Sequence, residues 1–269
     1  MNENTDRLES HIHQLYEFRS NIPSNLSIEK VKEVWAVEKK QSDIPLVIES
    51  RGNIIGEKLE VAKESLEWLI LKPFVKFVAI SGSVGSEFAE EEDDIDLFIV
   101  VKNDTVWIYR LCVYIRNILK KGIRSKGSSM RNKEVKDKLC INFLAEQRGL
   151  LFDEDIFNLN ELLYMVPIYN RDFLSVIFLN NSWLKDKYMV SDKFLDKGKL
   201  KVGDVKELTK RNYFIYPINF ISFLGQLFFM IIMKHDPDLK RLWSGFKNGT
   251  VEFYPKNFKE EKIKGLRPC

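Results

Sequence analysis

The chain has 269 residues, of which 45% are hydrophobic and 30% are charged, a composition typical of a folded globular protein rather than a disordered chain. The 42 basic and 39 acidic residues leave a formal net charge of only +3, so bulk charge gives no argument for tight, non-specific binding of nucleic acid. The three cysteines fit neither a disulfide framework nor a zinc site, which favours a reducing, cytoplasmic compartment. Cys112 and Cys140 lie in apolar runs, and we expect both to be buried thiols.

The first predicted elements are helices. Residues 5–41 have a helical pattern, with Ser24 and Ser27 as plausible caps. Residues 54–72 place apolar side chains on one side of a second helix, which we expect to end at Pro73 because proline cannot continue a helix.

The centre of the chain predicts a small α/β unit. Aromatic and β-branched residues predict three strands, at 74–80, 95–101 and 139–147. A loop with Gly82 and Ser83 and a short turn of helix separate the first two strands, and an amphipathic helix over 105–121 follows the second.

After residue 147 the pattern becomes helical and aromatic, through "NLNELLYMVPIY", "RDFLSVIFLNNSWL" and "DPDLKRLWSGFKNGTVEF". Residues 214–233 carry no formal charge, and this length is enough to span a bilayer. Because the segment contains Pro217, Asn219 and Gln226, we expect a buried helix at the centre of a helical subdomain and no stable membrane span. A membrane contact is the alternative.

The predicted fold class is therefore α+β, with a small mixed β-sheet. Residues 1–71 form an N-terminal helical segment, residues 72–147 the α/β core and residues 148–269 a C-terminal helical region.

Asp94 and Asp96 stand at the start of a strand, "IDLFIVV", that otherwise has the composition of a buried one. Residues two apart in a strand project from the same face, so these carboxylates lie a few ångströms apart. Burying unpaired carboxylates is costly, and a hard divalent cation removes that cost. The pattern predicts a Mg²⁺ (or Mn²⁺) site that also binds the phosphates of a nucleoside triphosphate (NTP).

Gly82 and Ser83 support the same interpretation. Glycine lets the backbone approach a ligand closely, and exposed N–H groups with a serine hydroxyl hold phosphate oxygens. Ten residues separate Ser83 from Asp94, enough for one or two helical turns before the chain returns to the sheet.

In this order, "SGSVGSEFAEEEDDIDLFIVV" resembles the signature of the DNA polymerase β-type nucleotidyltransferase superfamily. The segments "WLILKPFVKFVAISGSV", "TVWIYRLCVYIR", "LCINFLAE", "ELLYMVPIY" and "FLNNSWL" are similar to those of a group of prokaryotic nucleotidyltransferase-domain proteins. The resemblance covers roughly residues 55–260. It implies a small mixed sheet flanked by helices, with residues 72–147 as the nucleotidyltransferase core and a helical partner region.

The resemblance also implies an activity, in which a nucleoside monophosphate moves from an NTP such as ATP to a hydroxyl acceptor and pyrophosphate leaves. By the same resemblance, Asp94 and Asp96 are the catalytic metal ligands, and Gly82 and Ser83 hold the triphosphate. The sequence does not name the acceptor, which is a small molecule, a sugar, an RNA or a protein.

The chain departs from the superfamily pattern in one respect, because a third carboxylate usually lies on a later core strand and helps to activate the acceptor hydroxyl. The matching strand, "LCINFLAE", offers Asn142 and Glu146 as third metal ligand, and the helix "NELL" offers Glu161. An amide cannot act as a base. The third position therefore stays unassigned, and the alternative is a catalytically degenerate module of the same fold that binds a nucleotide or a protein partner.

Overall fold

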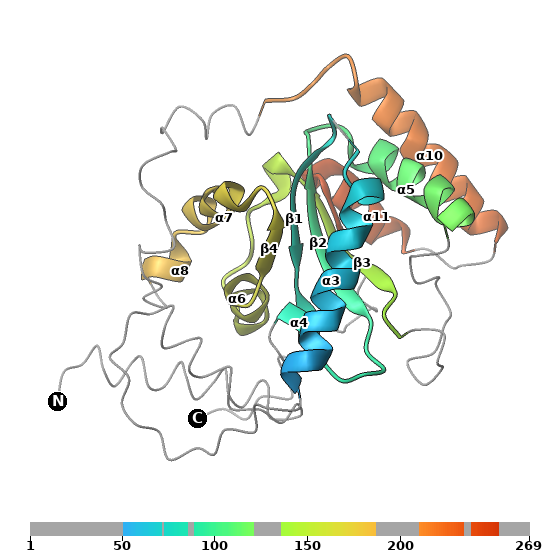
Figure 1. Ribbon diagram of the computed structural model, residues 1–269. Coiled ribbons are helices and arrows are strands. Elements are labelled where there is room, and N and C mark those ends of the chain that lie inside the picture. The colour runs from blue at the N-terminus through green and yellow to red at the C-terminus, as the bar shows by residue number, and fades with distance from the viewer. Residues whose placement is uncertain are drawn as a thin grey trace.

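The computed structural model describes residues 51–71, 73–85, 89–120, 136–186, 210–233 and 238–252. These residues form a mixed five-stranded sheet with helices on both faces (Figure 1), which confirms the predicted α+β class. The helical pattern within residues 5–41 lies outside the described residues.

The sheet has the strand order β4-β1-β2-β3-β5, in which β2 and β3 are parallel and the other pairs antiparallel. The strands are β1 (Val75–Ile80), β2 (Ile95–Val101), β3 (Leu139–Glu146), β4 (Val166–Tyr169) and β5 (Thr250–Glu252). The three central strands lie where the sequence predicts them, and all three are largely buried.

The two edge strands correct the sequence prediction, which placed both segments in a helical region. In β4, Pro167 has no N–H to donate, and a sheet tolerates such a residue at its edge. In β5, the chain turns at Gly249, whose φ of 74° ends the preceding helix, and then pairs with β3. The sheet therefore extends beyond the expected core of residues 72–147.

Two hydrophobic cores lie on opposite faces of the sheet (Figure 1). We call them the α6/α7 face, packed by α6 (Ile156–Leu163), α7 (Leu174–Asn180) and α8 (Trp183–Asp186), and the α3/α5 face, packed by α3 (Arg51–Leu69), α5 (Val106–Lys120), α10 (Tyr216–Ile232) and α11 (Leu239–Asn248). Successive residues of a strand pack into opposite cores. Phe98 of β2 packs on the α6/α7 face, whereas Leu97 packs on the α3/α5 face. The short helix α4 (Gly82–Gly85) joins β1 to the segment before β2.

A β-bulge in β3 changes this alternation at Asn142. Ile141 pairs with Leu97 but Phe143 pairs with the next residue of β2, Phe98, so Asn142 is the inserted residue. Before the bulge, odd-numbered Ile141 packs on the α3/α5 face. After it, odd-numbered Phe143 packs on the α6/α7 face.

Helix α10 also differs from expectation, because it does not lie at the centre of a helical subdomain. It packs along α5 and buries Asn219, Phe223 and Met230, while large apolar side chains such as Phe228 are exposed. Its polar residues face inward: the Asn219 side chain accepts hydrogen bonds from two N–H groups at the start of α5, and Gln226 donates to Trp107 O. Among the described helices, none is apolar over a length that would cross a membrane.

Candidate metal and phosphate site

Asp94, Asp96 and Cys140 converge at the end of the sheet where β2 and β3 begin. Their potential ligand atoms all lie within 4.8 Å of one another, and all three side chains are half-buried. Asp96 and Cys140 are direct neighbours across the parallel β2–β3 pair. Asp96 shares the α6/α7 face with Phe98, two residues further along the strand.

Gly82 lies directly against the Asp96 carboxylate. Its φ is +61°, a conformation that other residues rarely adopt. A Cβ atom at this position would lie 2.9 Å from Asp96 Cγ and closer still to Oδ2. The backbone at Gly82 therefore lies directly against the Asp96 carboxylate, and a residue predicted to bind phosphate is next to a residue predicted to bind the metal.

Ser81, immediately before this turn, holds β1 and β2 together at the site. Its N–H donates to Asp96 O over 2.9 Å, which continues the β1–β2 register so that Ser81 lies opposite Asp96. Residues opposite each other in an antiparallel pair project from the same face. The Ser81 side chain is 1% exposed, and its Oγ has no hydrogen-bond partner among the described residues. A buried hydroxyl without a partner is costly, and such groups are usually satisfied by an ordered water or a ligand.

Lys58 of α3 ties together the segments that lead into β2 and β3. Its ammonium group is buried and donates to Asp93 O at 2.6 Å, to Glu91 O at 3.1 Å and to Asp137 Oδ1 at 2.9 Å. At the surface, Lys136 forms a second bridge to the Glu91 carboxylate, and this pair lowers the pKa of Glu91. These bonds hold the residues that precede Asp94 and Cys140 against α3.

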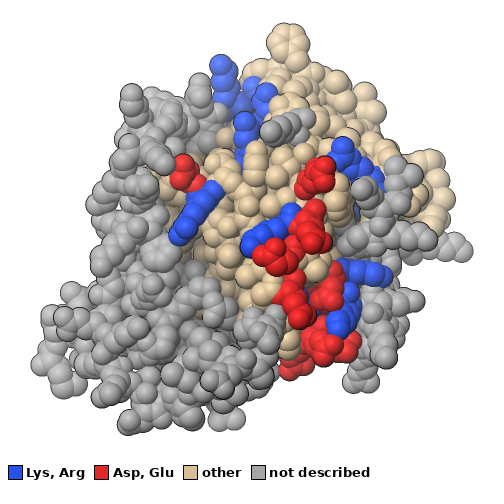
Figure 2. Space-filling view, in the orientation of Figure 1, with Lys and Arg blue, Asp and Glu red and all other residues tan. Residues whose placement is uncertain are grey.

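Acidic side chains cluster around the turn that precedes β2. Figure 2 shows them gathered over α3 and the turn that leads into the strand, where Glu90, Glu91 and Glu92 are exposed. Such a surface attracts cations and repels a nucleic-acid backbone that approaches from this side.

Glu146, one of the two candidates for the third ligand, is at the other end of β3, about 20 Å along the strand from Cys140 at about 3.3 Å per residue. The bulge at Asn142 also turns it to the α3/α5 face. There the carboxylate is fully buried, accepts from Val106 N and pairs with Arg148 at 2.7 Å. Glu146 is therefore a structural group at the start of α5 and is not part of the metal site.

Asn142, the other candidate, lies next to the site. Its Oδ1 is 3.3 Å from the sulfur of Cys140, whose thiol donates to it. The sulfur of Cys140, and not the amide, belongs to the group of potential ligands.

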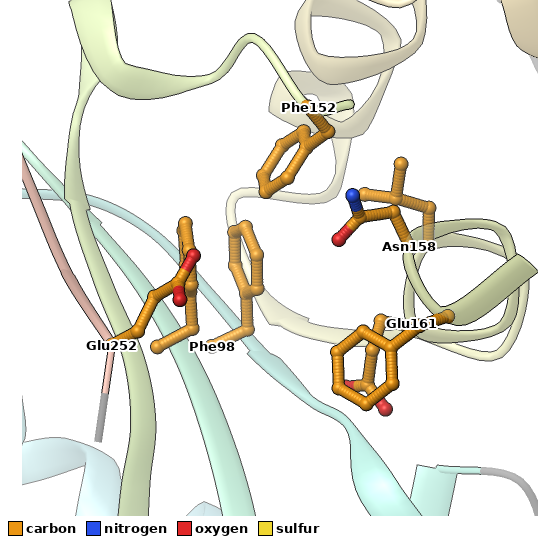
Figure 3. Close-up of a pocket in the computed structure, with 8 residues that line it drawn as sticks. Phe98, Phe152, Asn158, Glu161 and Glu252 are labelled. Atoms are coloured by element: carbon orange, nitrogen blue, oxygen red, sulfur yellow. The ribbon is translucent and has the colours of Figure 1, made fainter. Parts of the chain in front are cut away.

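Glu161 lines a narrow pocket on the α6/α7 face. Figure 3 shows this pocket between Phe98 of β2, Asn158 and Glu161 of α6, and Glu252 of β5, with the ring of Phe152 at one end. The pocket continues into a wider hollow of about 460 Å³, lined in addition by residues of β5, α11 and the turn Gln147–Gly149. Phe98, which lines this pocket, follows Asp96 by two residues on the same face of β2.

These residues fit a divalent cation. Two carboxylates and a thiol offer ligand atoms within reach of one ion, and Ser81 supplies a buried hydroxyl without a partner beside them. Sequence patterns predicted Asp94 and Asp96 but not Cys140, Ser81 or Lys58. The short "ISGS" run could have indicated Ser81, whereas Cys140 becomes recognisable only from the pairing of β2 with β3.

No family model, no curated protein and no solved structure matches the chain significantly.

Proposed function

We propose that the chain is a nucleotidyltransferase that depends on a divalent cation. It would transfer a nucleoside monophosphate from an NTP to a hydroxyl acceptor, with release of pyrophosphate. The observation that carries the proposal is the contact of the positive-φ Gly82 turn with the Asp96 carboxylate, which itself lies within 4.8 Å of a ligand atom of Asp94. Carboxylate oxygens with an adjacent phosphate-binding turn are the set that a metal–triphosphate complex requires.

Each residue has a distinct role in the proposed reaction. Asp94 and Asp96 hold the cation, and the Gly82–Ser83 turn donates hydrogen bonds to triphosphate oxygens. The bound Mg²⁺ or Mn²⁺ neutralises charge on the phosphates and on the leaving pyrophosphate. Positioning and charge neutralisation supply most of the catalysis in such a transfer.

The acceptor would enter through the hollow of about 460 Å³ on the α6/α7 face, which adjoins the narrow pocket lined by Glu161. Its hydroxyl oxygen forms a bond to the α-phosphorus, the bond from that phosphorus to the pyrophosphate oxygen breaks, and the hydroxyl proton passes to a base. Glu161 is the carboxylate of α6 that lines this pocket, and it is the residue we propose for that base.

The test is transfer of label from each of four α-³²P NTPs, with Mg²⁺ or Mn²⁺, to acceptors in a lysate of the host. We expect transfer by the wild-type chain and a loss of at least about a hundredfold in Asp94→Asn and Asp96→Asn. Glu92→Gln is the matched control, because this exposed carboxylate lies two residues before Asp94 and outside the ligand group. Full activity in both aspartate variants would refute the site.

A second function, binding without catalysis, is favoured by one observation: the neighbour of Asp96 on β3 is a thiol, Cys140, and not a carboxylate. Such a module binds an NTP with a divalent cation and transfers nothing. Equilibrium binding of a labelled NTP that needs the cation, without label transfer to any acceptor, would select this alternative.

A further inference from the structure

We propose that Cys140 is the third protein ligand of the cation held by Asp94 and Asp96, and that the site consequently binds Zn²⁺ or Co²⁺ more tightly than Mg²⁺. The inference rests on the proposed function in that both use one metal site. Cation binding is nevertheless measurable without nucleotide and without turnover.

The sheet itself places the sulfur in the ligand group. Asp96 and Cys140 are Cα partners in the parallel β2–β3 pair, and Asp94, just before β2, has a ligand atom within 4.8 Å of both. Metal–oxygen bonds of about 2.1 Å and metal–sulfur bonds of about 2.3 Å put two ligand atoms of one ion about 3.5 Å apart. The observed separations, all within 4.8 Å, lie within a small side-chain adjustment of that value.

An independent observation comes from Ser81. Its hydroxyl is buried opposite Asp96, on the other side of that residue from Cys140 in the sheet, and has no partner among the described residues. Native proteins satisfy almost all buried polar groups, by water or a ligand where protein groups are absent. A water on a cation held by Asp96 would satisfy this hydroxyl.

The bulge at Asn142 lies beside the sulfur. Bulges occur beside functional sites, where they redirect side chains. The pairing with Asp96 sets the side of the sheet on which Cys140 lies, and Oδ1 of the inserted residue Asn142 is 3.3 Å from its sulfur. When a metal–sulfur bond forms, the S–H bond breaks and its proton leaves to solvent. The amide group of Asn142, after a flip, can then donate to the sulfur, as the outer partners of metal ligands commonly do.

Sulfur decides which ion the site prefers. Thiolates are soft ligands that suit Zn²⁺ and Co²⁺, whereas Mg²⁺ prefers oxygen and water. With Mg²⁺, only the two carboxylates would contribute. With Zn²⁺ or Co²⁺, all three side chains would bind.

The experiment uses Co²⁺ as a spectroscopic probe of the full-length chain, freed of metal by a chelator. We expect a near-ultraviolet sulfur-to-cobalt charge-transfer band that saturates at one ion per chain and disappears when Zn²⁺ displaces the cobalt. In Cys140→Ser the band should be lost, and Zn²⁺ affinity should fall at least tenfold, the lower bound for loss of even an outer partner. Cys112→Ser is the matched control, because this half-buried thiol lies on α5, outside the ligand group.

A second measurement does not depend on how the variant folds. In the wild-type chain, Zn²⁺ should slow alkylation of Cys140 by iodoacetamide, followed by peptide mass spectrometry, and leave Cys112 unaffected. Absence of the band, its persistence in Cys140→Ser, or alkylation that Zn²⁺ does not slow would overturn the proposal. Nucleotidyl transfer without the band would refute this inference alone. The band without transfer would leave it standing and refute the proposed activity.

Discussion

At the scale of single residues, the closest packing in the site is that of Gly82 against Asp96. A side chain at Gly82 would need both a strained backbone at φ +61° and displacement of the carboxylate. We expect Gly82→Ala to lower the free energy of unfolding by about 1–3 kcal/mol. It should also weaken Mn²⁺ binding, because Asp96 must move. Chemical denaturation and metal titration measure the two effects.

Gly56→Ala provides the contrast. Gly56 lies in α3, and a Cβ there would meet nothing within 4 Å. We expect this variant to be about 0.5–1 kcal/mol more stable than the wild type and to bind metal unchanged, because alanine loses less backbone entropy in a helix. Equal effects of the two substitutions would contradict the close approach of Gly82 to Asp96.

Glu146 makes the stability of the fold depend on pH. Burial raises the pKa of its carboxyl above the usual 4.5, although Arg148 and backbone N–H groups act in the opposite direction. The folded state then holds the proton more tightly than the unfolded state, so this contribution to stability is present below about pH 4.5 and is lost as pH rises through the folded pKa. Above pH 4.5, the unfolding free energy of the wild type should therefore fall relative to that of Glu146→Gln. Urea unfolding across pH 4–7.5 tests this, and parallel profiles would disprove it.

At the scale of elements, α3 matters to the site through one side chain. Lys58 joins α3 to the segments before β2 and β3, and its charge is buried. Lys58→Met would leave two carbonyls and the half-exposed Asp137 carboxylate without this donor. We expect a loss of about 2–3 kcal/mol, below the value for a fully buried pair because water reaches Asp137.

The Lys58 variant should also loosen the site. Amide hydrogen exchange at residues 89–95 and 136–140 should become faster, and metal affinity should fall. Lys63→Met is the control, since Lys63 forms an exposed pair with Glu60 on the same helix and such pairs contribute less than about 1 kcal/mol. Unchanged exchange in Lys58→Met would show that the lysine does not organise these segments.

The bulge in β3 explains why the site was only partly predictable. Asp94 and Asp96 follow from strand alternation within one short segment, which needs no knowledge of the fold. The same alternation, carried along β3, would put Asn142 and Glu146 on one face, and the sequence does not reveal that Asn142 is an inserted residue. The sequence predicts Cys140 only as a buried thiol, whereas it is half-buried, and its position beside Asp96 depends on the pairing of two strands far apart in the chain.

At the scale of the whole molecule, sequence reasoning found the centre of the sheet but not its edges. The three central strands are long, apolar and β-branched, and their burial explains that composition. Strands β4 and β5 have four and three residues, and each becomes a strand only because a long neighbour offers free backbone groups. Local propensity is weak over so few residues, and tertiary pairing decides their structure.

The same is true of helix α10, whose uncharged sequence predicts a buried helix at the centre of a helical subdomain. Phe223 is 2% exposed and packs against Trp107, Trp243 and Phe246, whereas Phe228 on the same helix is 66% exposed.

Phe223→Ala should lower the free energy of unfolding by about 3–5 kcal/mol, because it leaves a cavity among these rings. Phe228→Ala should change the free energy of unfolding by less than about 0.5 kcal/mol, as exposed substitutions do. Both values are measured by denaturant unfolding of the chain at low concentration. A large loss in Phe228→Ala would mean that the outer face of α10 is packed in the folded protein, and similar small losses in both variants would place α10 outside the cooperative fold.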